Sequence, residues 1–162
     1  MDRTRVMILA IALLAVAPSQ AFADATLFLG ANTTPANRMV KGFAVGGSLL
    51  VLGFEIEYAH TPDDTNTLAP ALTTGMGNLL LQTPFELFGI QPYVTAGAGF
   101  YREKLGNTGH QETNVTLSSG GGIKIGLVGP VRLRVDYRVF KLAGGALSSP
   151  AHRVYAGLNL KF

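Results

Sequence analysis

The chain has 162 residues, no cysteine and a formal net charge of +3. A length of this order suits a single domain. Because cysteine is absent, disulfide bonds are excluded and a metal site would lack the ligand that best marks one in a sequence. The net charge is too small to indicate a nucleic-acid partner.

Residues 1–23 have the three-part pattern of a secretory signal peptide. Two arginines are followed by an uncharged apolar run over residues 6–17, and small residues then flank Phe22. The run is shorter than the roughly 20 residues of a membrane-spanning helix, so a transmembrane anchor is the weaker interpretation. We expect cleavage after Ala23, which leaves residues 24–162 as the mature domain.

After the signal peptide, apolar side chains recur with a period of two, which indicates β-strands rather than helices. Eight segments show or suggest this pattern. In chain order they lie around residues 26–31, 43–49, 54–58, 71–82, 93–101, 115–127, 131–139 and 153–162. In the segment 71–82 the sequence does not fix which residues share a face.

The strand expected over residues 131–139 has the sharpest division between two faces. One face is apolar. The other carries four charged side chains, Arg132, Arg134, Asp136 and Arg138. The segment 54–58 repeats the division, with Glu55 and Glu57 opposite large apolar residues. A soluble sandwich would have to bury these arginines or expose them beside few other charges, so we favour a sheet whose apolar face meets lipid.

The links between the expected strands alternate in length. Three short links lie near residues 51–53, 83–91 and 128–130, and four longer, more polar links lie at 32–38, 60–70, 105–113 and 143–150. Bacterial outer-membrane barrels have short periplasmic turns and longer external loops. The pattern therefore predicts an all-β, up-and-down barrel of eight antiparallel transmembrane strands with both termini in the periplasm.

Four segments of the mature chain resemble a known family. They are Pro92–Gly99, Gly120–Lys124, Val131–Arg138 and Tyr155–Phe162. With these segments the chain resembles the family of small outer-membrane β-barrel proteins that includes the opacity proteins and the transmembrane domain of outer membrane protein A. The resemblance covers residues 24–162 and implies location in the bacterial outer membrane. It does not imply one function, because the family includes structural anchors, adhesins and resistance factors.

The last of these segments is similar to the insertion signal of the family. Its members would be Tyr155, Gly157, Leu160 and Phe162. The resemblance implies that periplasmic chaperones deliver the chain to the barrel-assembly machinery, which reads this signal. Tyr155 departs from the pattern, because the first position is usually more polar. Outer-membrane lipids would surround the assembled barrel, which we expect to be a monomer.

The interior of an eight-stranded barrel is just filled by side chains or holds one small ligand. The expected strand with Glu55 and Glu57 is third and the arginine-rich strand is seventh, so they face each other across a ring of eight. Buried charges must pair, because an isolated one is very costly. We therefore expect an ion-pair plug and negligible conductance. The expected members are Glu55, Glu57, Lys124, Arg132, Arg134, Asp136, Arg138 and Arg153.

Five glycines are expected to face this interior, at positions 97, 99, 120, 122 and 157. They could make room for the long charged side chains. They could equally relieve the curvature of a tightly bent sheet.

Three functions from different classes remain after this reading. The first is a structural or surface-interaction role, the second a narrow channel or a small-molecule binder in the lumen, and the third, least supported, a lipid-modifying enzyme. His60, His110 and His152 are expected at the external rim, and no nucleophile, base and orienting group can be assembled around them. We expect no enzymatic activity and no cofactor, because the sequence contains no nucleotide, haem or metal motif.

Overall fold

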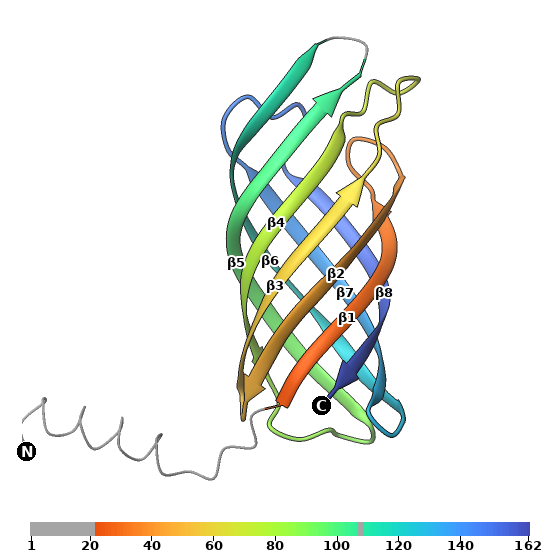
Figure 1. Ribbon diagram of the computed structural model, residues 1–162, viewed down its shortest axis with the longest axis vertical. Helices are drawn as coiled ribbons and strands as arrows, with labels where there is room; N and C mark the ends of the chain where they lie inside the picture. The colour runs from red at the N-terminus through yellow and green to blue at the C-terminus, as the bar shows by residue number, and fades with distance from the viewer. Residues whose placement is uncertain (1–21, 107–108) are drawn as a thin grey trace, which may run out of the picture.

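The computed structural model describes residues 22–106 and 109–162, so most of the expected signal peptide, residues 1–21, lies outside the described residues. The described chain forms eight β-strands (Figure 1). They are β1 (Phe22–Asn32), β2 (Arg38–Leu49), β3 (Leu52–Thr61), β4 (Ala71–Gln82), β5 (Ile90–Leu105), β6 (His110–Val128), β7 (Val131–Leu142) and β8 (Ala151–Lys161). Within these described ranges, no helix is long and apolar enough to cross a membrane.

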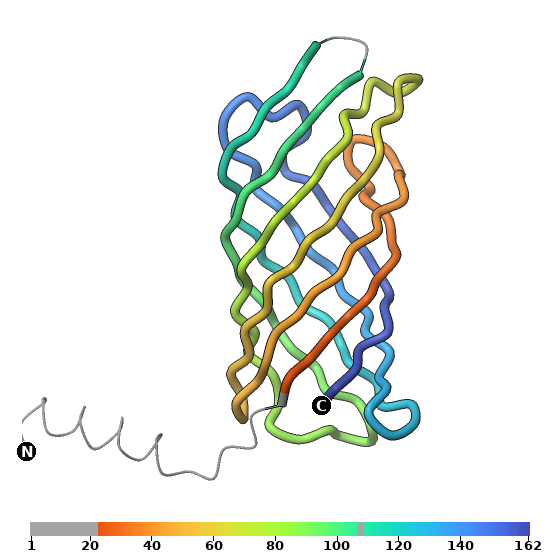
Figure 2. The backbone as a smooth tube through the Cα atoms, viewed as in Figure 1, coloured from red at the N-terminus to blue at the C-terminus, as the bar shows by residue number. Residues whose placement is uncertain are grey.

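Each strand pairs antiparallel with the next one in the sequence, and β8 pairs with β1, which closes the sheet into a barrel. The strands slant around the barrel, and β1 starts at the same end at which β8 finishes (Figure 2). We call this the terminus end and the opposite end the loop end. The expected fold class, an eight-stranded antiparallel up-and-down barrel, is confirmed.

The first strand begins two residues before the expected cleavage site. Ala23 and Phe162 exchange backbone hydrogen bonds, with N···O distances of 2.7 Å and 2.9 Å. Cleavage after Ala23 would remove this pair and leave β1 to begin at Asp24, opposite Lys161. The position of cleavage stays a prediction.

The link between β5 and β6 differs from the prediction. A long loop was expected over residues 105–113, but β5 runs to Leu105 and β6 starts at His110, so the two strands continue as a hairpin that rises beyond its neighbours (Figure 1). Pairs such as Glu103 with Glu112 carry the sheet through this polar stretch. The prediction was wrong because the hairpin is polar where it leaves the apolar wall, and polar composition alone resembles a loop.

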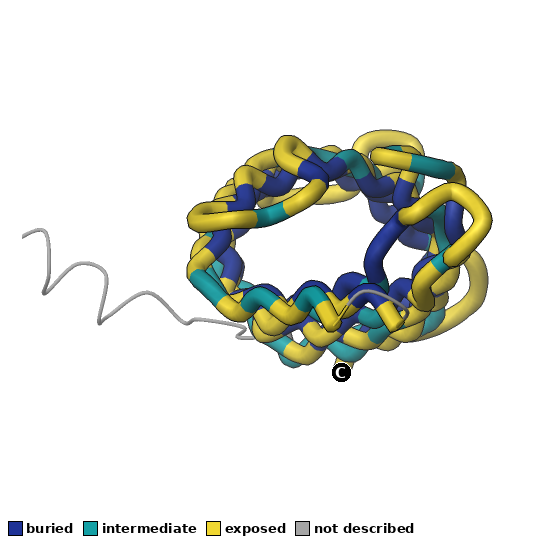
Figure 3. The backbone as a smooth tube through the Cα atoms, turned by 90° about the horizontal axis from the view of Figure 1, so that it is seen from above, coloured by how far each residue is buried: buried dark blue, intermediate teal, exposed yellow. Residues whose placement is uncertain are grey.

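The wall of the barrel has an apolar outer face and a largely polar inner face. Phe54 and Leu79 are 63% and 70% exposed, whereas Glu57 and Arg138 are fully buried. Buried and exposed residues alternate around the wall when the barrel is seen from above (Figure 3). This arrangement is the reverse of a soluble domain, in which apolar side chains gather inside.

The structure also fixes the faces of β4. Leu72, Met76 and Leu80 point inward and are buried, and Leu79 and Leu81 point outward. The sequence could not decide this, because three consecutive leucines occupy both faces near the terminus end of the strand.

Inward glycines allow the strands to approach closely. A Cβ atom at Gly120 would lie 2.2 Å from the Tyr137 carbonyl oxygen and 2.9 Å from the Arg138 Cγ. At Gly122 it would lie 2.2 Å from the Val135 carbonyl oxygen and 2.6 Å from the Tyr93 hydroxyl. Both explanations therefore apply: the tight bend brings the neighbouring backbone close, and the large inward side chains fill the remaining space.

Candidate functional site

The centre of the barrel is held by Arg138 of β7, which three carboxylates surround. Its guanidinium lies 2.6 Å from Glu55 Oε1, 2.9 Å from Glu57 Oε2 and 2.9 Å from Asp136 Oδ1. Glu55 and Glu57 come from β3 on the opposite wall, so the contacts cross the lumen. Because the arginine and two of its partners are completely inaccessible to solvent, these pairs lie in a low-dielectric interior.

Arg134, four residues nearer the terminus end of β7, contacts the same glutamate, Glu55, with two nitrogens. Its Nη1 and Nη2 atoms lie 2.7 Å and 3.1 Å from the two oxygens of Glu55. Such a bidentate pair is stronger and more directional than a single contact. Its Nε donates to the Tyr93 hydroxyl at 2.7 Å, and Tyr93 in turn donates to Asp136.

Arg153 of β8 completes the set on the side of the loop end. Its Nη1 lies 3.0 Å from Glu57 Oε1, and its Nε donates to Asn32 Oδ1 at 3.1 Å. The guanidinium also lies 4.3 Å above the Phe140 ring, a cation–π contact. We call Glu55, Glu57, Arg134, Asp136, Arg138 and Arg153 the central network.

The other two expected members of the ion-pair plug, Lys124 and Arg132, lie nearer the terminus end and belong to a separate group. Both contact Asp24 at the start of β1, with distances of 2.9 Å and 2.5 Å. Arg132 also donates to Asn159 and Gln91, at 2.8 Å and 3.1 Å. The structure therefore brings these cations to a carboxylate at the terminus end, where Asp24 keeps 14% of its side chain exposed. We call Asp24, Lys124 and Arg132 the lower group.

Several members of the interior were missed from the sequence. Tyr93 links two charged partners, and Tyr155 accepts from Arg138 at 3.2 Å while its ring stacks on Phe28 with a centroid distance of 4.1 Å. Asp24, at the start of β1, was not among the expected members either. Strand alternation, which assigns these residues to the inner face, was the available signal.

The expected insertion signal is divided between the two faces of β8. Tyr155 and Gly157 face the lumen, whereas Leu160 and Phe162 are 46% and 71% exposed on the outside. The outward pair is therefore open to a partner that approaches from the lipid side.

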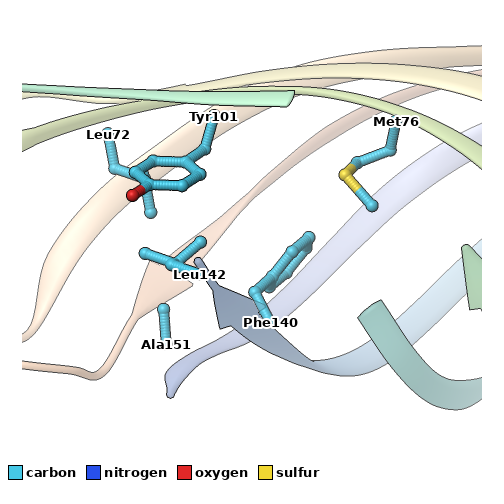
Figure 4. Close-up of a cluster of buried hydrophobic side chains, with 6 residues drawn as sticks. All are labelled: Leu72, Met76, Tyr101, Phe140, Leu142 and Ala151. Atoms are coloured by element: carbon cyan, nitrogen blue, oxygen red, sulfur yellow. The ribbon is translucent and has the colours of Figure 1, made fainter. Parts of the chain in front are cut away.

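The half of the lumen near the loop end contains an apolar cluster beside two buried charged side chains, Arg38 and Glu103. Leu72, Met76, Tyr101, Phe140, Leu142 and Ala151 form a buried cluster (Figure 4). These side chains extend from β4 and β5 on one wall and from β7 and β8 on the other. The ring of Phe140 joins this cluster to the central network, because it also contacts the guanidinium of Arg153.

A cavity of about 450 Å³ lies above this cluster, at the mouth of the loop end. Its lining combines apolar side chains of the links, including Leu68 and Leu147, with His110 and Ser148. The hydroxyl of Ser148 is buried and has no hydrogen-bond partner among the described residues. The cavity is thus mainly apolar with one unsatisfied polar atom.

All three histidines lie near the loop end, where they were expected. His60 shares a hydrogen bond of 2.9 Å with the Thr73 hydroxyl, and His152 one of 2.7 Å with the Tyr137 hydroxyl. His110 Nε2 lies 3.9 Å from Glu103. In the part of the chain that the structure describes, no group of three or more potential ligands could hold a metal ion.

Solved structures share this architecture. The chain is similar to the N-terminal β-barrel domain of Pseudomonas aeruginosa OprF, with a TM-score of 0.69 and 14% identity over 89% of this chain and 99% of that one. It is similar to Neisserial surface protein A (TM-score 0.65, 18% identity, 88% and 96% coverage). It is also similar to the outer membrane enzyme PagL (TM-score 0.50, 14% identity, 86% and 98% coverage). At these identities the likeness establishes the fold. No protein-family model and no curated protein sequence matches the chain.

Proposed function

We propose that the chain is an integral β-barrel of the bacterial outer membrane with a structural or surface-interaction role and a closed lumen. An outer wall of large apolar side chains around a charged interior supports the membrane location, because water would penalise the first and lipid the second. The same fold in OprF and Neisserial surface protein A is consistent with this location.

The single observation that carries the closed lumen is the position of Arg138. Its guanidinium bonds to carboxylates of both β3 and β7, so it lies across the lumen rather than along one wall. Moving it aside would leave Glu55 and Glu57 buried with fewer partners, which is strongly unfavourable. Ions and water-soluble nutrients would therefore find no open path.

A planar-bilayer recording tests the closed lumen. Refolded wild-type protein should give no steady current steps at moderate voltage, because the central network lies across the axis. Large channels that stay open would overturn the proposal. Circular dichroism on the same preparation would establish that the barrel had folded.

We propose further that both termini face the periplasm, because two of the three links at the terminus end, 50–51 and 129–130, are tight turns. Because the chain has no cysteine, single cysteines can be labelled without background. Asp63→Cys, in an exposed link at the loop end, should react with an impermeant maleimide on intact cells, and Phe85→Cys, exposed at the terminus end, should react only after lysis. The reverse pattern would refute this orientation.

The cavity at the loop end favours one alternative, binding of a small apolar molecule that accepts a hydrogen bond from Ser148. Its mainly apolar lining and unsatisfied hydroxyl are typical of ligand sites. An apolar fluorescent probe should then bind the refolded barrel, and Leu147→Trp, which would fill the cavity, should abolish binding. Equal binding by both proteins would exclude this site.

A lipid-modifying activity stays the least supported reading, although PagL shows that the fold accommodates an enzyme. The hydroxyl partners of His60 and His152 are a threonine and a tyrosine on the outer wall, and no third group orients either histidine there among the described contacts. We expect no acyl chains to be released from lipopolysaccharide by the refolded protein. Their release would overturn this expectation.

We also propose that Leu160 and Phe162 are the part of the terminal signal that the barrel-assembly machinery contacts. Both lie exposed on the outer face of the last strand. Phe162→Ser should lower the amount of folded barrel in cells, whereas Phe54→Ser, an outward phenylalanine of β3 near the same end, should lower it less. An equal loss from both variants would argue against a signal.

A further inference from the structure

A groove of about 790 Å³ crosses the outer wall over β7, β8, β1, β2 and β3. Two rows of outward side chains flank it, and neighbours within each row are paired across adjacent strands. The first row is Leu133, Leu158, Leu27, Phe43 and Tyr58, and the second row is Ala156, Leu29, Lys41 and His60. Except for the last two of these residues and the tyrosine hydroxyl, the flanks are hydrocarbon.

The groove has the length and direction of a lipid chain in one leaflet. It starts beside Leu133, near the terminus end of β7, and ends beside His60, near the loop end of β3. Five strands spaced about 4.8 Å apart give it a length of roughly 19 Å. Half of the hydrocarbon core of a bilayer is roughly 15 Å thick, so a slanting acyl chain fits along it.

The polar end of the groove lies at the loop end. Lys41 is exposed, and no carboxylate in the described ranges forms an ion pair with it. His60 lies beside it on the neighbouring strand, and the hydroxyl of Thr73 fixes one nitrogen of its ring at 2.9 Å. The ammonium of Lys41 and the hydrogen-bonded imidazole of His60 therefore lie on neighbouring strands at the end of the apolar groove.

Elsewhere on the outer wall, the positively charged side chains also lie near the loop end. The outward lysines and arginine of the described strands are Lys41, Arg102, Lys104 and Lys141, and all four lie near the loop end. Each of these cations lies two to four residues nearer the loop end than an outward aromatic residue of the same strand, as Arg102 does relative to Phe100. Carboxylates of the same strands face inward, as the alternation assigns them.

This order matches the layers of a membrane interface. Aromatic side chains gather at the boundary of the hydrocarbon, and two residues further along a tilted strand lie about 5 Å higher, among the headgroups. A belt of one charge sign at that level attracts anionic lipid, at about 1 kcal/mol for each cation near the surface.

From these features we infer that the groove is a binding site for one phosphate-bearing lipid. An acyl chain lies between the two rows, and Lys41, assisted by His60, binds the phosphate. The chain supplies affinity through apolar contact, and the ammonium selects an anionic headgroup over a zwitterionic one. The inference depends on the proposed membrane location, and it is independent of whether the lumen is closed.

Native mass spectrometry of refolded protein in detergent tests this site. Phosphatidic acid should be retained more strongly than phosphatidylcholine with the same chains. Lys41→Gln should reduce the retention of phosphatidic acid about fivefold and leave phosphatidylcholine unchanged, and Lys41→Arg should preserve the preference. Lys141→Gln, the matched control in the belt but outside the groove, should have a smaller effect.

A second variant tests the groove itself. Ala156→Phe would fill the groove and should reduce the retention of both lipids about tenfold, because several buried methylenes would lose contact at about 0.8 kcal/mol each. Ala98→Phe, an outward alanine of β5 away from the groove, is the control. Equal retention of both lipids by wild-type protein, or equal effects of a variant and its control, would overturn the site.

Two further measurements distinguish lipid binding from binding of free phosphate, and loss of the site from misfolding of the protein. If inorganic phosphate or glycerol phosphate displaced the bound lipid, the site would be one for free phosphate and the lipid inference would fail. The migration of unboiled protein on a denaturing gel reports whether each variant has folded. A failure of the membrane location would appear there, as loss of the heat-dependent shift in the wild-type protein, and not in the choice of lipid.

Discussion

The two halves of the lumen differ in the side chains that fill them. At its centre, six charged side chains from β3, β7 and β8 form ion pairs of 2.6 Å to 3.1 Å across the axis. Toward the loop end, an apolar cluster from β4, β5, β7 and β8 packs together beside the buried Glu103. The ion pairs depend on direction and on complete pairing, whereas the apolar cluster depends mainly on contact area.

The comparison indicates where the barrel tolerates change. Removing one partner of a buried ion pair leaves another charge stranded, which costs more than the pair contributed. Apolar packing accepts changes of shape as long as the volume is conserved. We therefore expect substitutions in the central network to destabilise the barrel strongly, and substitutions in the apolar cluster that conserve volume to destabilise it little.

The largest effect is expected for Arg138→Met. The change keeps much of the side-chain volume but leaves Glu55, Glu57 and Asp136 without their common partner, so the free energy of unfolding should fall by about 3–5 kcal/mol. Urea unfolding in lipid vesicles, followed by circular dichroism, measures it.

Adding Asp136→Asn to the Arg138→Met protein should recover part of that loss, because Glu55 keeps Arg134, Glu57 keeps Arg153 and the surplus carboxylate charge disappears. Arg102→Met, on the outer wall, should cost less than about 1 kcal/mol. If the two arginine variants were equally stable, the central network would not stabilise the barrel as described.

Isosteric changes sharpen the contrast between the halves. Glu57→Gln removes one charge that faces Arg138 and Arg153 and should cost about 2–3 kcal/mol. Met76→Leu, in the apolar half, conserves volume and should cost less than about 1.5 kcal/mol. The same unfolding assay compares them, and a costlier Met76→Leu would reverse the expected order.

The smallest effect is expected in the lower group. Asp24→Asn breaks contacts to Lys124 and Arg132, but the carboxylate is partly exposed and water replaces some of its interactions. The loss should be about 1 kcal/mol at low ionic strength and should shrink in 1 M salt. A loss that salt leaves unchanged would place this group in the same dry environment as the central network.

Strand alternation was sufficient to predict most of the fold. On β7 it separated Arg132, Arg134, Asp136 and Arg138 from an apolar face, and a ring of eight then placed them opposite Glu55 and Glu57. Alternation failed where both faces have the same character, as at the leucines of β4. It also failed at the β5–β6 hairpin, where the strand continues beyond the apolar wall.

The composition of the interior was only partly predictable. Arginines and glutamates can be recognised in a sequence by their charge. Whether Tyr93 or Asn32 contacts them depends on the position of each side chain along the barrel axis. The stagger between strands sets that position, and it follows from closure rather than from local sequence. For the same reason Lys124 and Arg132 could not be assigned to Asp24 beforehand.

The seam between β1 and β8 has a consequence for assembly. Ala25 pairs with Leu160, so the two sides of this edge lie far apart in the sequence. The contact of Arg153 with Glu57 also requires the last strand to be in place. Until β8 is in place, Arg138 of β7 also lacks its contact with Tyr155. This dependence favours all-or-none closure of the barrel over stepwise insertion of strands. A chain that lost its final strand should therefore not form a stable intermediate.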